Sequence, residues 1–308
     1  MKKTSMAVLA AGLFGLLSAR AADPVALTAV APQTAAQPPA SGLSLPDWLR
    51  RTDISVESMD RNNPTWSVET VQPIYQTPRT LSDTVFFQGR WGRRNSDNTF
   101  NLGLGYRKLL DDKTWLLGVN TFYDTTTRYD HKRWGLGAEA IGQYLTFRTN
   151  FYHAISGERT ISLINGISTT EKALSGHDFE IDAPLPYLSW MRVAANAYRW
   201  KSATSGVDDV KGAKLAFKGN ISKNVSLELG RQDDNYSRPA SFIKISYNLL
   251  GNPGNGVAGT LLTGLRSPVS FEARDLTLHT LDKVRRQNDI VVERKTSGGS
   301  GVTIGRRN

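Results

Sequence analysis

Residues 98–124 alternate bulky apolar side chains with small, polar or charged ones, in two stretches that a short turn separates. In the first stretch Phe100, Leu102, Leu104 and Tyr106 share one set of alternate positions, and asparagine, glycine and arginine fill the other. Successive side chains of a β-strand point to opposite faces. The pattern therefore predicts a hairpin of two strands, each with one apolar and one polar face.

The same alternation continues as far as residue 249, in runs of about ten residues separated by turn residues. It predicts twelve strands, at 52–59, 65–76, 83–93, 97–108, 113–124, 131–141, 143–154, 174–182, 189–201, 209–220, 223–233 and 239–249. Connections after every second strand are short, whereas the others are often longer, most clearly residues 155–173. This arrangement is typical of an antiparallel outer-membrane β-barrel whose longer loops face outward.

Two features indicate which face of the sheet is turned outward. Charges recur in mid-strand on the polar face, which suits a wet lumen better than a dry core; they are Arg90, Arg107, Glu139, Arg148, Lys214, Lys218, Glu228 and Lys244. Six of the seven tryptophans fall near predicted strand ends, as aromatic girdles at two membrane interfaces require; they are Trp66, Trp91, Trp115, Trp134, Trp190 and Trp200. We therefore expect a transmembrane barrel, and not a soluble β-sandwich or lipocalin-like barrel.

The N-terminus indicates export. An apolar run at residues 6–17 follows Lys2 and Lys3 and precedes Ala19-Arg20-Ala21, so residues 1–21 read as a signal peptide. Residues 22–47, rich in alanine and proline, predict a disordered periplasmic lead-in before a barrel at 48–250. The chain has no cysteine, which excludes disulfides and thiolate metal sites. Its net charge of +10 does not indicate nucleic-acid binding, because no basic helical motif accompanies it in this exported chain.

The chain continues well past the last predicted strand. A Gly/Asn/Pro-rich break at 251–256 leads to residues 270–295, which carry charges of both signs, and then to a Gly/Ser-rich end. About ten extended residues cover roughly 33 Å, so residues 270–295 are long enough to cross a membrane. We expect residues 251–295 to form a linker that starts in the periplasm and either stays there or returns through the pore, and residues 296–308 to form a flexible tail.

A set of residues spread over about residues 48–295 forms a pattern of fixed order and spacing. Its members are Phe87, Gln88, Arg93, Arg94, Asn101, Gly103, Gly105, Arg107, Asn120, Phe122, Tyr123, Asp124, His131, Arg133, Gly135, Leu136, Gly137, Glu139, Gly176, Asp178, Leu185, Pro186, Asp282, Val284, Arg286, Asn288, Ile290 and Val291. In this pattern the chain resembles the β-domain of the intimin/invasin family, the inverse autotransporters of type V secretion.

The resemblance implies a 12-stranded outer-membrane anchor whose C-terminal segment passes back through the pore and leads a passenger to the surface. It also implies the barrel-assembly machinery as a partner. The sequence departs from the family's pattern in three places. Glu171-Lys172-Ala173 replaces a Glu-Arg-Pro motif, Arg294 stands where an aromatic residue is common, and residues 296–308 leave no room for a passenger, so we expect a passenger-less form.

Candidate chemistry is sparse, and we expect no catalytic, cofactor-binding or metal-binding residues and no cofactor. The four histidines, His131, His153, His177 and His279, are scattered without metal-ligand spacing. Asp124, Asp130 and His131 fall together on a predicted outer loop, which keeps an acid–base pair as a remote option. The remaining candidates are Ser156 and Ser175, which lack a G-x-S-x-G context, and Gly103 and Gly105, which lie inside a strand with no helix after it.

These observations predict an inverse-autotransporter-type barrel in the outer membrane of a Gram-negative bacterium, with a possible role in adhesion. Its expected partners are outer-membrane lipid, the assembly machinery and a host or neighbouring-cell surface. The alternative function is a porin-like channel for small solutes, if the linker does not fill the lumen. We do not expect an enzyme.

Overall fold

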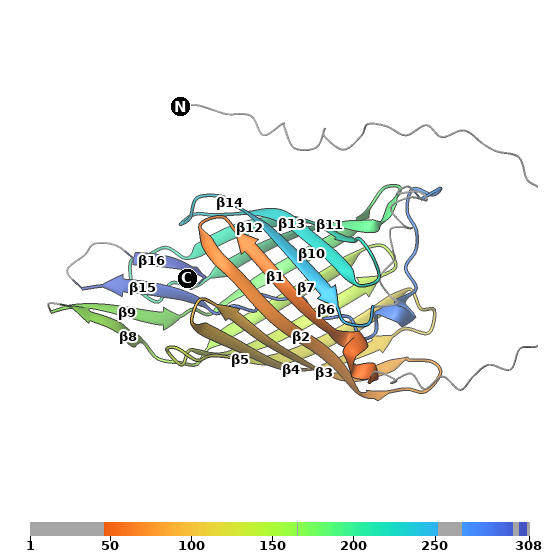
Figure 1. The fold of residues 1–308 in the computed structure, drawn as a ribbon, viewed down its shortest axis with the longest axis horizontal. Helices are drawn as coiled ribbons and strands as arrows, with labels where there is room; N and C mark the ends of the chain where they lie inside the picture. The colour runs from red at the N-terminus through yellow and green to blue at the C-terminus, as the bar shows by residue number, and fades with distance from the viewer. Residues whose placement is uncertain (1–45, 165, 252–266, 298–301, 307–308) are drawn as a thin grey trace, which may run out of the picture. The chain divides into compact units, whose positions relative to one another are not determined.

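The computed structural model describes residues 46–164, 166–251, 267–297 and 302–306. Twelve antiparallel strands close into a barrel in the order β1-β14-β13-β12-β11-β10-β7-β6-β5-β4-β3-β2 (Figure 1). The strands are β1 (Thr52–Met59), β2 (Asn62–Gln76), β3 (Asp83–Arg94), β4 (Asp97–Leu109), β5 (Trp115–Thr126), β6 (Lys132–Gly142), β7 (Thr146–Ala154), β10 (Gly176–Leu185), β11 (Leu188–Trp200), β12 (Val210–Asn220), β13 (Val225–Asp234) and β14 (Ala240–Asn248). Pairing of β1 with β14 closes the sheet, so no strand of the barrel keeps an unpaired edge.

The twelve predicted strands are confirmed, with bounds that differ by no more than three residues. The predicted contrast in loop length is confirmed only for the second half of the barrel. There the β7–β10 and β11–β12 connections, residues 155–175 and 201–209, are long, whereas β1–β2 and β3–β4 are joined by residues 60–61 and 95–96. Those two tight turns are shorter than the β2–β3 and β4–β5 connections at the other end of the barrel.

The apolar face points outward, as predicted. Leu102, Leu104 and Leu136 are 51%, 52% and 61% exposed, whereas Asn101 and Arg107 on the opposite face are fully buried. In a soluble barrel this order would be reversed, because apolar side chains would fill the interior. The exposed apolar band is the surface that a lipid bilayer would cover.

The tryptophan prediction is only partly right. Trp66, Trp91 and Trp134 are exposed on the outward face, where a girdle requires them. Trp200 instead points inward and is buried in a cluster with Tyr152, and Trp190 lines the interior. Proximity to a strand end therefore did not decide the face, because strand parity places Trp190 and Trp200 on the inner side of β11.

A second sheet of four strands has the order β16-β15-β9-β8. Its strands are β8 (Arg159–Ile164), β9 (Ile167–Ala173), β15 (Val291–Thr296) and β16 (Val302–Arg306). Strands β8 and β9 arise within the long β7–β10 connection, where the sequence predicted a loop. Strand β15 takes up the last residues of the expected linker, and β16 lies in the expected flexible tail. The predicted signal peptide and most of the lead-in lie outside the described residues; 3-10 helices occur at η1 (Asp47–Arg51) and η2 (Leu276–His279).

Candidate functional site

The candidate site is the inward face of the barrel together with residues 270–291, here called the C-terminal segment. One end of this segment lies at the turns between β6 and β7 and between β10 and β11. Arg274 donates to the Gly142 carbonyl at 2.6 Å, and Tyr187 N–H donates to the Ser270 carbonyl at 2.8 Å. Leu276 is fully buried among Leu109, Leu116 and Ile141 of the wall, and these four residues give this end of the segment an apolar anchor.

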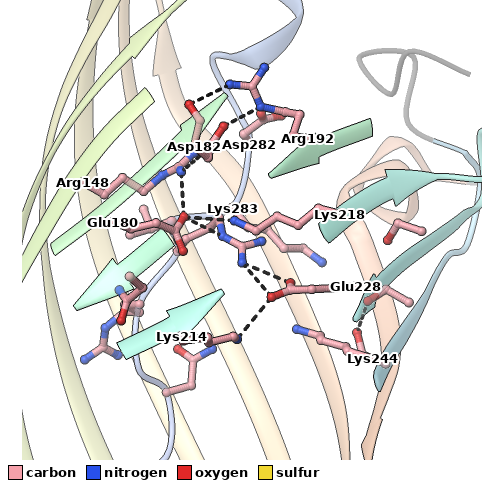
Figure 2. A pocket seen from close by; sticks show the side chains of 18 of the residues that line it. Arg148, Glu180, Asp182, Arg192, Lys214, Lys218, Glu228, Lys244, Asp282 and Lys283 are labelled. Atoms are coloured by element: carbon pink, nitrogen blue, oxygen red, sulfur yellow. Dashed lines mark hydrogen bonds and ion pairs between the residues drawn. The ribbon is translucent and has the colours of Figure 1, made fainter. Parts of the chain in front are cut away.

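Arg285 of the segment joins two acidic side chains of the barrel wall, Glu180 and Glu228. Figure 2 labels both acids and the basic wall residues around them. The Arg285 Nε lies 3.1 Å from Glu180 Oε1, and its Nη2 lies 3.0 Å from Glu228 Oε2. Both carboxylates are also paired with basic wall residues, which are Arg148, Lys214 and Lys218. Because the cationic segment residue sits between two wall acids, both strands β10 and β13 hold the same point of the segment.

Arg286 forms a second buried pair, with Asp124 on β5. Its two terminal nitrogens lie 2.6 and 2.7 Å from the two carboxylate oxygens, which is the bidentate geometry of a strong guanidinium–carboxylate pair. Arg133 Nη2 contacts the same carboxylate at 2.8 Å, and the Arg286 guanidinium lies over the Phe122 ring at 4.4 Å. A β-carbon at Gly135 would lie 2.7 Å from Arg286 Nη2, so glycine leaves room for this side chain.

Wall side chains also bind the backbone of the segment. Arg107 Nη1 donates to the carbonyls of Thr280 and Asp282 at 3.0 and 2.6 Å. Further wall-to-backbone hydrogen bonds are Arg133 to the Gln287 carbonyl at 2.6 Å, Asn101 to the Asn288 carbonyl at 2.9 Å, Asn150 to the Arg285 carbonyl at 3.2 Å and Val284 N–H to Gln88 Oε1 at 2.8 Å. Such bonds satisfy the polar backbone of residues 280–288, which belong to no helix or strand.

The other end of the segment joins the second sheet. Val291 accepts from Leu174 N–H at 2.9 Å, and β15 pairs antiparallel with β9. Arg294 Nε lies 2.7 Å from Glu171 Oε2, and His131 Nε2 lies 2.9 Å from Glu171 Oε1. Two of the three departures from the family's pattern thus meet here. The unusual Arg294 places its guanidinium against the glutamate of the altered Glu171-Lys172-Ala173 motif.

Glycine and aromatic residues interlock on the inward face. Gly105 lies opposite Phe86 on β3, and Gly103 lies opposite Phe122 on β5. A β-carbon at either glycine would overlap the facing phenylalanine ring. The two rings pack with Val71 and with Val284 of the segment in a buried apolar cluster. Gly103 and Gly105 therefore make space for an apolar anchor of the segment.

The segment leaves part of the interior open. A cavity of about 670 Å³ lies between the segment and the walls formed by β1 and β10–β14. Charged side chains line it, among them Glu57, Glu69, Lys214, Lys218 and Lys244. All eight mid-strand charges predicted for the polar face are on the inward side; most are paired with each other or with the segment. The remaining space is polar and large enough for water and small ions.

Of the predicted candidates for chemistry, the structure brings His131 and Ser156 together but separates Asp124 from Asp130. Asp124 points inward to Arg286, whereas Asp130 lies on the outer connection and pairs with Lys132 at 2.9 Å. His131 is buried between Glu171 and Ser156, whose Oγ lies 3.4 Å from His131 Nδ1. The Glu171 carboxylate that contacts His131 is also paired with Arg294, and Ser156 Oγ accepts from the Lys132 N–H at 3.1 Å. The contacts of Ser156 fit its predicted role in a turn.

Metal-ligand groups and membrane-spanning helices are both absent from the described residues. Within the described ranges, no three His, Cys, Asp or Glu side chains are grouped so that they could hold a metal ion. In the same part of the chain, no helix has the length and apolar character to cross a membrane. The expectation of no catalytic, metal or cofactor site therefore stays a prediction.

Sequence reasoning missed the partners of the C-terminal segment. It identified Arg286 and Asp124 as matches to a family pattern but did not pair them, and it did not single out Arg285, Glu180 or the β15–β9 pairing. The signal that could have found Glu180 is its position on the inward face of β10, between Asp178 and Asp182. Three acids at alternate positions in a lumen demand several cations, and residues 283–286 supply three.

Comparison with known proteins agrees with this geometry. The family model for the inverse autotransporter β-domain matches residues 22–288. A putative attaching and effacing protein homolog of Escherichia coli K12 is 32% identical over 130 residues, 42% of this chain and 41% of that protein. The inverse autotransporter adhesin YeeJ of the same organism is 26% identical over 236 residues, 72% of this chain and 9% of that protein. This chain therefore spans less than half of these relatives, and its lack of a passenger stays a prediction.

A solved structure gives the same fold. It comes from work on the in-meso crystallization of membrane proteins, has a TM-score of 0.62 and 19% identity, and covers 80% of this chain and 100% of its own. The barrel therefore lies in the lipid of a Gram-negative outer membrane. A closed barrel of twelve strands, an apolar outer face and the family match together identify the chain as a member of the inverse autotransporter family that carries the family's β-domain.

Proposed function

We propose that the barrel is an anchor and translocator, and that its C-terminal segment threads the pore from the periplasm to the cell surface. Contacts along the whole segment support this proposal. They begin at the β6–β7 turn with Arg274, continue through Arg285 and Arg286 on the inward wall, and end where β15 pairs with β9. A single extended chain would thus connect the two ends of the barrel.

The character of these contacts suits a segment that must first enter and then stop. Buried ion pairs add little net stability, since desolvation offsets much of their attraction, but they penalise any register that leaves a charge unpaired. Arg285 and Arg286 are adjacent and point to opposite walls, toward Glu228 and Asp124. A shift of the segment by one residue would exchange these directions and leave both arginines without their carboxylates. The pairs therefore define one resting position.

A tag after Asn308 tests the threading. In intact cells we expect external protease to remove this tag, because the C-terminus follows β16 in the second sheet. A control tag in the β2–β3 connection, residues 77–82, should be cut only after the outer membrane is opened. If the C-terminal tag is instead protected in intact cells, the segment does not reach the surface and the translocator function is wrong.

A second candidate function is a narrow channel, which the cavity of about 670 Å³ beside the segment favours. In planar bilayers we expect small conductance from the mature chain and a large stable pore after deletion of residues 270–308. A large pore from both proteins would favour the channel over the translocator.

We further propose the barrel-assembly machinery as the partner during insertion, and a host or neighbouring-cell surface as the partner of the outer loops. The β8–β9 hairpin supports the second proposal, because Leu163, Ile164 and Ile167 are 70%, 66% and 50% exposed there. We also propose that the chain has no catalytic role. A hydrolytic activity of the purified barrel that disappears on replacement of His131 would refute this.

A further inference from the structure

A row of basic side chains crosses the outward face of the barrel at one rim. His153 and Arg199 are the second-last residues of β7 and β11, His177 is the second residue of β10, and all three are exposed. Lys201 follows β11, and Lys211 is the second residue of β12. These five residues, the basic row, lie at the strand ends that carry the long connections 155–175 and 201–209, which is the rim expected at the outer leaflet.

The row brings like charges together. His177 lies directly opposite Arg199 across the β10–β11 pair, and Arg199 lies directly opposite Lys211 across the β11–β12 pair. Like charges at directly opposed positions destabilise a sheet. Charged side chains on the lipid face of a barrel are also unfavourable, least so at the membrane interface. A cluster of this kind is therefore expected only where an anion compensates it.

The protein supplies one such anion. Asp209 Oδ2 lies 2.5 Å from Arg199 Nη2. The Ser202 N–H and the Arg199 side chain, which both donate to this carboxylate, lower its pKa, so Asp209 stays ionised and balances one charge. Among the described residues, the side-chain nitrogens of Lys201 and Lys211 take part in no ion pair. The row thus keeps a positive excess from Lys201 and Lys211.

An apolar hollow lies directly beside the row. It has a volume of about 580 Å³, and its lining includes Trp134, Leu136 and Phe151 together with His177, Arg199 and Lys201. The three apolar side chains are 48%, 61% and 55% exposed. Trp134 and His153 are cross-strand neighbours, as are Phe151 and His177, so two of the three apolar side chains lie next to the basic row, and Leu136 lies opposite Phe151. The hollow therefore combines a hydrocarbon surface with cationic groups at one edge.

We propose that this surface binds a phosphorylated, multiply acylated lipid of the outer leaflet. Its acyl chains would lie on Leu136 and Phe151, and its phosphate would receive charge-assisted hydrogen bonds from Arg199, Lys201 and Lys211. Phosphate is the group that matches this edge, because guanidinium and ammonium groups both bind it and because it supplies the missing negative charge. The inference uses the outer-membrane location of the barrel and does not depend on the path of the C-terminal segment.

Native mass spectrometry of the folded full chain in detergent tests the site. The probes are bisphosphorylated lipid A and the same lipid without its phosphates. We expect the chain to bind the phosphorylated lipid at least about tenfold more tightly, which corresponds to one good charged contact. The double variant R199Q/K211Q should lose this preference. The matched control R93Q/K108Q also removes two exposed outward-facing cations, but from β3 and β4, and should keep it.

Three results would contradict binding of a phosphorylated lipid at this surface. Equal binding of the two lipids, equal loss in the control, or displacement of the lipid by excess inorganic phosphate would overturn the proposal, the last because it would indicate a site for free phosphate. Heat-modifiable migration on gels reports folding of each variant. If R199Q/K211Q does not fold, K201Q provides the test, since Lys201 lies outside the strands and its removal must still weaken binding of the phosphorylated lipid severalfold.

Discussion

Replacement of Asp124 by asparagine should release the C-terminal segment. In the native protein this carboxylate sits between Arg286 and Arg133, whose side chains are 1% and 0% exposed. The variant leaves both guanidinium groups buried without a counter-charge. Removal of one partner from a buried ion pair costs about 3–5 kcal/mol. Part of that cost falls on Arg133 in the wall, and the part that falls on Arg286 favours displacement of the segment.

The size of the effect follows from these numbers. If about half of the cost, roughly 2 kcal/mol, opposes the seated segment, the population of displaced segments rises about 30-fold, since 1.4 kcal/mol corresponds to a factor of ten. Single-channel recording measures this population as the fraction of time spent at the conductance of the segment-deleted pore. We expect D124N to increase that fraction by one to two orders of magnitude.

Two further variants make the test specific. D130N is the matched control, because Asp130 is 56% exposed and pairs with Lys132 on the surface, where an ion pair contributes about 0–1 kcal/mol. In the double variant D124N/R286Q the unpaired segment charge is gone, so the effect should be smaller than the two single effects combined, by about 0.5–3 kcal/mol of coupling. If D124N opens no more often than D130N, Asp124 does not hold the segment and the reasoning fails.

Three other changes have defined outcomes. Gly105→Ala would place a methyl group into the facing phenylalanine ring, so we expect about 1–3 kcal/mol of destabilisation and a lower midpoint of heat modifiability, whereas Gly157→Ala, with nothing within 4 Å, should behave like the native chain. Burial would raise the pKa of Glu293, but hydrogen bonds from residues 202–204 outweigh burial and lower this pKa. These hydrogen bonds therefore stabilise the β11–β12 connection at any pH above the ordinary pKa of 4.5. The stabilisation is lost as the pH falls through the lowered pKa. Hydrogen exchange at the Ala203 amide, which donates to Glu293 at 2.9 Å, should therefore be protected at pH 7 and lose its protection at acidic pH, and an E293Q chain that showed the same pH dependence would contradict this assignment. Arg294→Phe restores the aromatic residue common in the family but removes the guanidinium that pairs with the buried Glu171 carboxylate. We therefore expect proteolysis of the second sheet, in which β9 pairs with β15, to become faster, and an unchanged cleavage rate would show that this ion pair does not hold the sheet.

The sequence by itself determined the barrel. Alternation with period two is a local property of each strand, and short turns join most strands to their neighbours, so the number of strands, their bounds and the outward direction of Leu102 or Leu136 could be predicted without tertiary information. The same logic placed Arg107 and Glu139 on the inward face. The girdle argument was wrong for Trp190 and Trp200, because it used distance from the strand end and ignored which face of β11 these residues occupy.

Only the tertiary structure decided what the inward residues contact. Arg286 and Asp124 are 162 positions apart in the chain, and no local period relates them. The fit of Phe86 over Gly105 depends on the register of β3 against β4, which hydrophobic alternation fixes only to within steps of two residues. The β15–β9 pairing joins a loop insertion to the chain end and forms only once the barrel brings both to one rim. Strand faces follow from sequence because they are set residue by residue, whereas the seating of the C-terminal segment is a choice among distant partners that the closed barrel makes available.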